Sequence, residues 1–256
     1  MMFDEKAGKV NPPAAIKDYK FDPKTHRYSF NMAGNIKVGN IATWSTLMGD
    51  YVYTGMPGVL KGIKGTCGNC GECRKACYVR ASYRFPSVIF SQAVNTWGLR
   101  NALDKVEADL SGAIARRNIS LVRINQSGEV ENAEQMAMWC RLATGFPDTK
   151  FYIYTKMYDL AEQFLLGGQV PENFTVLYSV WHSLGVEEYA RVKHLPNVKA
   201  FVYDDGVDRK LDTKCFCPAY RIPEGGTRAK MNHNVKCETC RLCIDSKVGI
   251  IGCLDH

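Results

Sequence analysis

Cysteine placement is the feature that most constrains this chain of 256 residues. Ten of its 11 cysteines fall into two groups near opposite ends of the sequence. Each group contains a C-x2-C-x2-C run, whose short gaps let three thiolates turn inward around one inorganic centre. The spacing predicts iron–sulfur binding, with one or two [4Fe-4S] clusters. The first cysteine group is Cys67, Cys70, Cys73 and Cys77, and the second cysteine group is Cys215, Cys217, Cys237, Cys240, Cys243 and Cys253.

Zinc stays open as the alternative metal, because four cysteines also make a tetrahedral structural site. The pair Cys215 and Cys217 with the pair Cys237 and Cys240 would suit a zinc ribbon. The third cysteine of each run favours iron, since two pairs already satisfy zinc. A mixture of one cluster and one zinc ion is also compatible with the spacing.

The remaining cysteine and the apolar pattern bear on the cellular compartment. Cys140 follows Met136, Met138 and Trp139 on the apolar side of a predicted helix, where cysteine behaves as a small buried hydrophobe. Residues 1–10 are charged and unlike a signal peptide, and no apolar run approaches the roughly 18 residues that cross a bilayer. We expect a cytoplasmic protein without membrane contact, whose thiols stay reduced.

The formal net charge of +7 permits nucleic-acid binding. No long basic run or aromatic-interleaved motif supports that function. Basic residues instead gather around both cysteine groups, among them Arg74, Arg80 and Arg241. Neighbouring cations favour thiolates over thiols, so these residues are expected to support the metal.

Three segments organise the chain. The sequence pattern of residues 1–65 predicts an extended segment with a hairpin that turns at Gly34-Asn35. Residues 66–207 predict a β/α core that carries the first cysteine group. Residues 208–256 form a cysteine-rich tail, which is too poor in apolar periodicity for a large core of its own and would be organised by metal.

Strands alternate with helices through the central segment. An amphipathic helix over Leu99 to Ile114 precedes them. The alternation indicates an α/β fold with a parallel sheet, either a partial (β/α) barrel-like sheet or an open doubly wound one. The predicted strands are Ile119 to Asn125, Phe151 to Thr155, Phe174 to Trp181 and Val198 to Tyr203, and the predicted helices are Asn132 to Ala143, Tyr158 to Leu166 and Val186 to Lys193.

Polar residues after these strands are the candidate catalytic and cofactor-binding groups, because βα loops gather at the carboxyl ends of parallel strands. Glu129, Lys156 and His182 are the predicted catalytic residues. Ser127, Gly128 and Glu129 form a turn that lets the backbone approach a cofactor while the carboxylate accepts hydrogen bonds.

The order of a cysteine loop, a helix and a strand ending in Gly-Glu resembles radical S-adenosylmethionine enzymes. That resemblance implies a cluster on three cysteines and S-adenosylmethionine near Gly128-Glu129. The spacing departs from it, because Cys70-x2-Cys73-x3-Cys77 reverses the two gaps of the C-x3-C-x2-C motif. Cys67 adds a fourth thiol.

Three motifs together resemble the phage gene product eighty-eight family over about residues 60–250. They are the stretch Cys67 to Tyr78, the strand Arg123 to Glu129 and the strand Phe151 to Lys156. Asn125 and Gln126 depart from the histidine and small residue expected there. The resemblance implies phage origin and a metal site rather than a particular reaction.

These observations predict an iron–sulfur protein of the host cytoplasm, with redox or radical enzyme chemistry and an electron donor protein or a small-molecule substrate as partner. A non-enzymatic electron carrier and a zinc-stabilised phage protein that binds nucleic acid are the alternatives.

Overall fold

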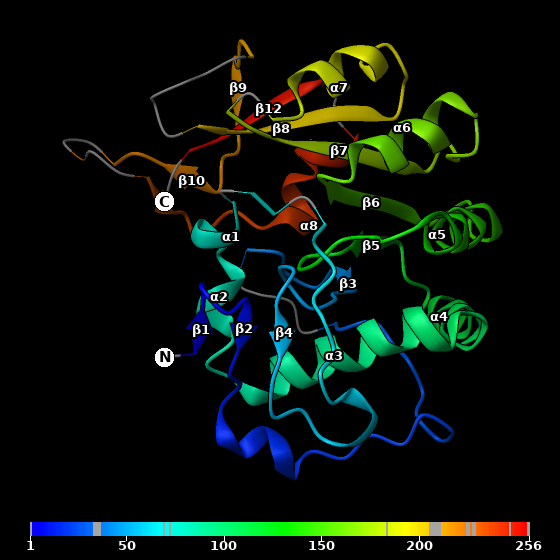
Figure 1. Cartoon of the computed structure of the whole chain (residues 1–256). Helices are drawn as coiled ribbons and strands as arrows, with labels where there is room; N and C mark the ends of the chain where they lie inside the picture. The colour runs from blue at the N-terminus through cyan, green and yellow to red at the C-terminus, as the bar shows by residue number, and fades with distance from the viewer. Residues whose placement is uncertain are drawn as a thin grey trace. The chain divides into compact units, whose positions relative to one another are not determined.

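The computed structural model describes residues 2–32, 37–68, 70–71, 73–182, 184–204, 211–223, 226, 229–245 and 247–254 (Figure 1). The chain forms two compact units. Unit 1 contains Met1–Phe30, Trp44–Asn118 and Asn125–Trp139, and unit 2 contains Asn31–Thr43, Ile119–Ile124 and Cys140–His256.

Unit 2 is built on a seven-stranded sheet with the order β3-β5-β6-β7-β8-β12-β9. Every neighbouring pair in this sheet is parallel. The four predicted strands are therefore confirmed, as is the parallel sheet. The strands are β3 (Ala42–Thr43), β5 (Leu121–Ile124), β6 (Lys150–Thr155), β7 (Phe174–Trp181), β8 (Val198–Asp204), β9 (Cys215–Phe216) and β12 (Ile250–Leu254).

Helices α6 (Tyr158–Leu166) and α7 (Val186–Val192) cover one face of this sheet (Figure 1). Tyr178 of β7 stacks on Tyr158 of α6 at 5.5 Å between ring centroids and lies 6.3 Å from Tyr189 of α7. The predicted end of α6 at Gly167-Gly168 is confirmed, because Gly168 takes the left-handed conformation with a φ of 65°.

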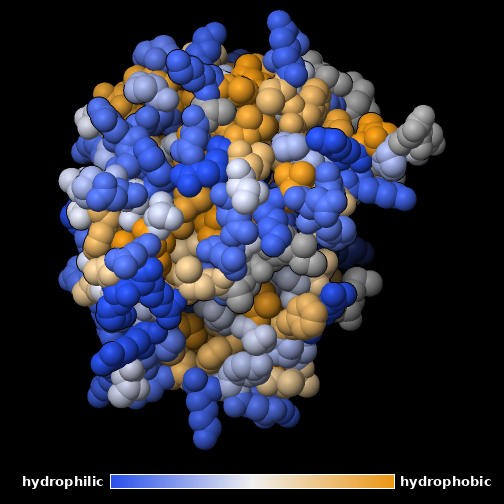
Figure 2. All heavy atoms as spheres, turned by 180° about the vertical axis from the view of Figure 1, so that it is seen from behind, coloured by the Kyte–Doolittle hydropathy of each residue, from blue (hydrophilic) through white to orange (hydrophobic). Residues whose placement is uncertain are grey.

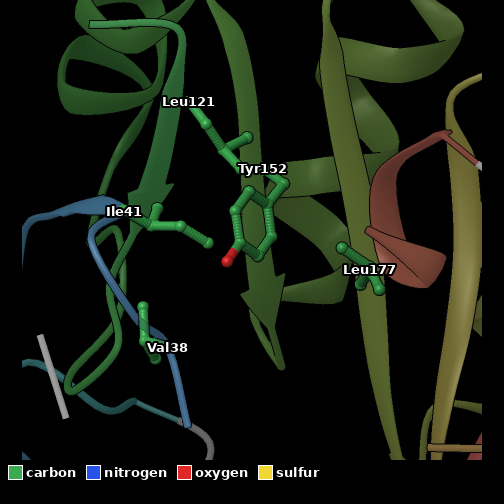
Figure 3. Packing of buried hydrophobic residues seen from close by; sticks show 5 residues of the cluster. All are labelled: Val38, Ile41, Leu121, Tyr152 and Leu177. Carbon is green, nitrogen blue, oxygen red and sulfur yellow. The ribbon is translucent and has the colours of Figure 1, made fainter. Parts of the chain in front are cut away.

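The opposite face carries a core cluster of Val38, Ile41, Leu121, Tyr152 and Leu177 (Figure 3). The Tyr152 ring lies between Ile41, Val38 and Leu121 on one side and Leu177 on the other. Cys237 and Cys243 of the second group pack against this cluster. A second, smaller cluster of Cys217, Ala219 and Ile251 lies within the tail, and Cys243 packs against it too. The remaining tail elements are β10 (Tyr220–Arg221), β11 (Lys230–Met231), α8 (Cys237–Cys240) and α9 (Leu242–Asp245).

Unit 1 contains two long helices, α3 (Pro86–Asn101) and α4 (Leu103–Arg117). The single helix predicted over Leu99 to Ile114 is wrong, because Ala102 leaves the helical region with φ −150° and ψ 45°. Apolar periodicity continues across the break, so spacing alone hides it. The other elements are β1 (Phe3–Asp4), β2 (Lys9–Val10), β4 (Val52–Tyr53), the 3₁₀ helices η1 (Ala14–Asp18) and η2 (Gly58–Leu60), α1 (Cys73–Ala76) and α2 (Val79–Ser82).

Helix α5 (Ala133–Gly145) begins with the predicted cap. Asn132 Oδ1 accepts the Gln135 N–H at 3.0 Å, and Gln135 Oε1 accepts the N–H of Glu131 at 3.0 Å. These two bonds satisfy backbone donors that the first helical turn leaves open. The boundary between the two units falls inside this helix, after Trp139.

The sheet is open, with β3 and β9 at its edges, so a closed barrel is not formed by the described strands. From β3 to β8 the strand order follows the chain without reversing, whereas a doubly wound sheet reverses at a switch point. Beyond β8 the order departs from the chain, because β12 lies between β8 and β9. The barrel-like arrangement stays a prediction. The division into segments 1–65, 66–207 and 208–256 also stays a prediction.

The predicted hairpin turn at Gly34-Asn35 lies outside the described residues. Among the described residues before this turn, Asn31 forms an antiparallel bridge with Thr43 of β3. The pairing therefore joins the segment to the large sheet.

Hydrophilic side chains occupy much of the face drawn in Figure 2, with hydrophobic residues between them. Among the helices of the described part of the chain, none combines the length and apolar character that a membrane crossing requires.

Candidate metal and ligand sites

The first cysteine group lies in unit 1 on a loop that ends in α1. Cys67 Sγ accepts the backbone N–H of Gly49 at 3.2 Å. A hydrogen bond with the Cys70 thiol, together with lost hydration, raises the pKa of Cys67 well above its usual value, and the Glu129 carboxylate adds to this rise. Cys67, Cys70 and Glu129 therefore share one neighbourhood. The structure brings the predicted cysteine loop and the predicted Gly-Glu turn together.

The turn of residues 125–129 is bonded to both flanks of the cysteine loop. Thr66, which precedes Cys67, accepts the N–H of Glu129 on Oγ1 at 2.8 Å. Tyr78, which follows Cys77, donates its hydroxyl to the carbonyl oxygen of Gln126. The loop and the turn are thus fixed as one piece.

Gly128 has a packing reason to be glycine. Its φ is 78°, and a Cβ atom there would lie 2.0 Å from Thr46 Oγ1 and 2.5 Å from Thr66 Oγ1. Ser127 is also engaged, since its backbone oxygen accepts the Thr46 N–H at 2.9 Å and its hydroxyl donates to Gln92 Oε1 at 3.2 Å. The backbone at Gly128, expected from the sequence to approach a cofactor closely, instead packs against the side chains of Thr46 and Thr66. Cofactor binding by Ser127, Gly128 and Glu129 stays a prediction.

Carboxylates neutralise the arginines beside this loop. Glu5 accepts from Arg80 at 2.6 Å and from Arg74 at 3.2 Å, while Arg74 also donates to Asp50 at 2.9 Å. Burial opposes ionisation of Glu5, but hydrogen bonds from Arg80, Tyr51 and Arg74 hold its pKa below the usual value. These arginines therefore connect the N-terminal segment to the region of the cysteine loop. Because their positive charge is partly neutralised by Glu5, they stabilise thiolates less than unpaired arginines would.

The second cysteine group lies in unit 2, on the sheet face opposite α6 and α7. Burial raises the pKa of Cys243 to about 11; a hydrogen bond from Tyr154 opposes the rise, whereas nearby Cys217 and Cys237 add to it. Burial also raises the pKa of Cys237, and Cys217 and Cys240 add to that rise. Cys237 is therefore near Cys217, Cys240 and Cys243, and we take these four thiols as one set.

Cations stand beside this set. Arg123 and Lys37 both oppose the rise in the pKa of Cys237. Arg123 lies over the Tyr154 ring at 4.9 Å, and the Lys37 ammonium lies over the Tyr220 ring at 4.1 Å. Arg123 and Lys37 are not among the basic residues that the sequence predicted to support the metal, because neither lies next to a cysteine run.

Short backbone bonds tie the tail run to the segment before β3. The Cys237 N–H donates to the carbonyl oxygen of Lys37 at 2.8 Å, and Glu238 accepts the Asn40 N–H at 2.6 Å. Lys199, buried on β8, donates to the carbonyl oxygen of Leu242 at 3.2 Å. Burial lowers the pKa of this lysine, while the nearby Cys243 raises it.

The described residues contain no ready-made metal cage of three or more His, Cys, Asp or Glu side chains. All 11 cysteines are free thiols. The donor chemistry fits a thiolate-bound metal, and binding would require the thiols of each group to close on it. Metal ligation by the ten predicted cysteines therefore stays a prediction.

Lys156 and His182 follow β6 and β7 in unit 2, whereas Glu129 belongs to unit 1. His182 has a positive φ of 51° and lies 6.1 Å from the Trp181 ring and 6.3 Å from the Tyr203 ring. Trp181 and Tyr203 stack on each other at 3.8 Å. The three predicted catalytic residues are thus not members of one described cluster, and their roles stay predictions.

Comparison with known families decides the relationship of the chain. The family described as Gene product 88 matches residues 29–246. The chain belongs to the Gene product 88 family. The match includes the first cysteine group and the turn of residues 125–129, and it supports the predicted bacteriophage origin.

No curated protein matched the chain, and no solved structure did either. The resemblance to radical S-adenosylmethionine enzymes gains no support from the comparisons. What this Gene product 88 family member does is therefore argued from its own residues.

Sequence reasoning missed the residues that hold the cysteine groups in place. Thr66 and Tyr78 adjoin the outer cysteines of the first loop, and that adjacency was the available signal. Tyr154 and Lys37 carried no such signal, because only the folded sheet brings them to the tail. Cys140, predicted to be core, is confirmed as buried, and burial raises its pKa to about 12.

Proposed function

We propose that the chain is an iron–sulfur protein that holds one cluster at each cysteine group and serves redox chemistry in the host cytoplasm. The observation that carries the proposal is the interacting set of Cys217, Cys237, Cys240 and Cys243 beside two cations. Free thiols throughout the described chain suit a reducing compartment.

The first ligand set is proposed from the cysteine spacing, and the second from the same contacts together with the spacing. Cys67, Cys70, Cys73 and Cys77 would hold the first cluster, and Cys217, Cys237, Cys240 and Cys243 the second. A bound cluster supplies one-electron transfer at a potential that hydrogen bonds to sulfur adjust. The chain contributes such bonds at Cys67, through the Gly49 N–H, and at Cys243, through the Tyr154 hydroxyl.

Cation placement explains how the second group would hold anionic ligands. Thiolates must form before metal binds, and burial alone disfavours them. Arg123 and Lys37 offset part of that cost at Cys237. An electron donor protein or a small-molecule substrate is the partner that this function would require, and Glu129, Lys156 and His182 are the proposed polar groups for it.

The test is metal and sulfide analysis of matched cysteine variants purified without oxygen. Cys67→Ser with Cys70→Ser should remove the iron of the first group only, and Cys237→Ser with Cys243→Ser that of the second only. Cys140→Ser should leave iron and sulfide unchanged, because this thiol is buried apart in the core. Zinc without sulfide in all variants would refute the proposal and support the zinc alternative.

Enzyme and carrier are separated by adding S-adenosylmethionine to reduced protein and recording the cluster EPR signal. A changed signal or cofactor cleavage would support radical chemistry near Glu129. An unchanged signal with reversible reduction would support an electron carrier.

A further inference from the structure

We propose that the turn of residues 125–129 binds a small molecule through Asn125. The ligand presents a planar edge on which an N–H donor stands beside an acceptor, as adenine and primary carboxamides do. This deepens the proposed function by giving the first cysteine group a ligand, and it rests on that function for the neighbouring cluster.

Asn125 has an unusual side-chain environment. The residue is only 4% exposed, and within the described part of the chain neither Oδ1 nor Nδ2 has a hydrogen-bond partner. Buried amides nearly always find partners, because an unpaired one loses its hydration without compensation. An amide with both functions open matches a ligand that supplies one donor and one acceptor.

The backbone around Asn125 is held in a conformation that fixes this amide. Its φ is 52°, in the left-handed region that asparagine tolerates better than most residues. The next residue, Gln126, donates its N–H to the carbonyl oxygen of Trp44 at 3.2 Å and accepts the Tyr78 hydroxyl on its own carbonyl oxygen. A left-handed backbone held from both sides together with an unpaired polar group is a combination that favours a binding site.

The position of the turn gives the ligand its neighbour. Tyr78 and Thr66, which flank the first cysteine group, both bond to the turn that contains Asn125. A molecule bound at Asn125 therefore contacts a turn that is hydrogen-bonded to the residues flanking both ends of the cysteine loop. Substrate or cofactor placed there would be close to the first cluster of the proposed function.

Two variants remove the amide while keeping the backbone. Asn125→Gly suits the positive φ, and Asn125→Asp preserves shape and one acceptor but loses the donor. The matched controls are Asn118→Gly and Asn118→Asp, because Asn118 also has a positive φ, of 47°, in unit 1 and is exposed.

Binding is measured by equilibrium dialysis on the full chain with adenosine, with nicotinamide and with inosine, which carries a carbonyl in place of the exocyclic amine. We expect adenosine or nicotinamide to bind, inosine to bind more weakly, and both Asn125 variants to weaken binding by about tenfold or more. The Asn118 variants should bind like the unaltered protein. Asn125→Gly should not lower the melting temperature.

If neither adenosine nor nicotinamide binds, or if the Asn125 variants bind as well as the unaltered protein, the inference is overturned. The amide is then assigned to a buried water. Iron and sulfide are assayed in the same samples. Iron with no probe binding contradicts the ligand site alone, whereas probe binding that depends on Asn125 without iron contradicts the proposed function alone.

Discussion

The two cysteine groups share one spacing, yet the chain supports them differently. The first is fixed by polar contacts, in which Gly49, Thr66 and Tyr78 bond to the loop or to the turn beside it. The second packs on an apolar sheet face, and the side chains of its helices α8 and α9 are partly buried or exposed. Equal spacing therefore predicts equal metal chemistry but says little about how much of each site the protein builds by itself.

This difference has an energetic consequence. Three hydrogen bonds, one of them buried, hold the first loop without metal, whereas the short helices of the second group have too few contacts to be stable alone. Metal binding should therefore contribute little to the folding of the first loop and much to that of the tail.

The largest effect is expected from Gly128→Ala, which attacks the packing of the first site. The new methyl group would meet Thr46 and Thr66 in a backbone conformation that disfavours any side chain. Strain and overpacking together should lower the free energy of unfolding by about 3–5 kcal/mol in urea denaturation.

Gly55→Ala is the matched control, because Gly55 has a φ of 68° and open space where the added methyl group would lie. It should cost about 1–2 kcal/mol from strain alone. Equal losses in the two variants would show that packing at Gly128 is unimportant.

Metal removal sharpens the contrast between the two groups. After chelation under reducing conditions, hydrogen exchange should accelerate about 100-fold in α8 and α9, because local opening is no longer opposed by ligation. The amides of Gly49 and Glu129 should keep their protection, since their acceptors are protein atoms. Similar acceleration in both groups would contradict the difference in support.

A smaller effect is expected when one hydroxyl is removed from each region. Thr66→Val leaves the buried N–H of Glu129 without an acceptor and should cost about 1–3 kcal/mol in urea denaturation. Thr239→Val in α8 removes an exposed hydroxyl that donates to the carbonyl oxygen of Lys236, so its cost should stay within about 0.5 kcal/mol. A larger loss at Thr239 would reverse the comparison.

Apolar periodicity predicted the parallel sheet, because strand and helix patterns depend on local sequence. The break at Ala102 escaped prediction, since apolar spacing does not record a backbone dihedral. The two-residue strand β3 is too short to show alternation. Contacts such as Tyr154 with Cys243 and Lys37 with Cys237 join segments that only the fold brings together.

Cys140 offers a third cysteine environment and the smallest expected effect. Its pKa rises from 9.0 in the unfolded chain to about 12 in the fold, chiefly by burial. Below pH 9 the thiol is neutral in both states, whereas between about pH 9 and pH 12 only the unfolded state loses the proton, so stability falls as pH rises.

Comparison of Cys140→Ala with the unaltered chain isolates this contribution. From about pH 8 to pH 10, the unaltered chain should lose about 1 kcal/mol more stability than the variant in urea denaturation. Identical pH dependence would mean that this thiol is as hydrated in the fold as in the unfolded chain.

The most direct measurement is the amount of iron, zinc and acid-labile sulfide per chain in protein purified without oxygen. The account predicts iron and sulfide in comparable amounts, enough for a cluster at each cysteine group, and no stoichiometric zinc. Zinc without sulfide, or thiols with no metal at all after anaerobic reconstitution, would contradict it.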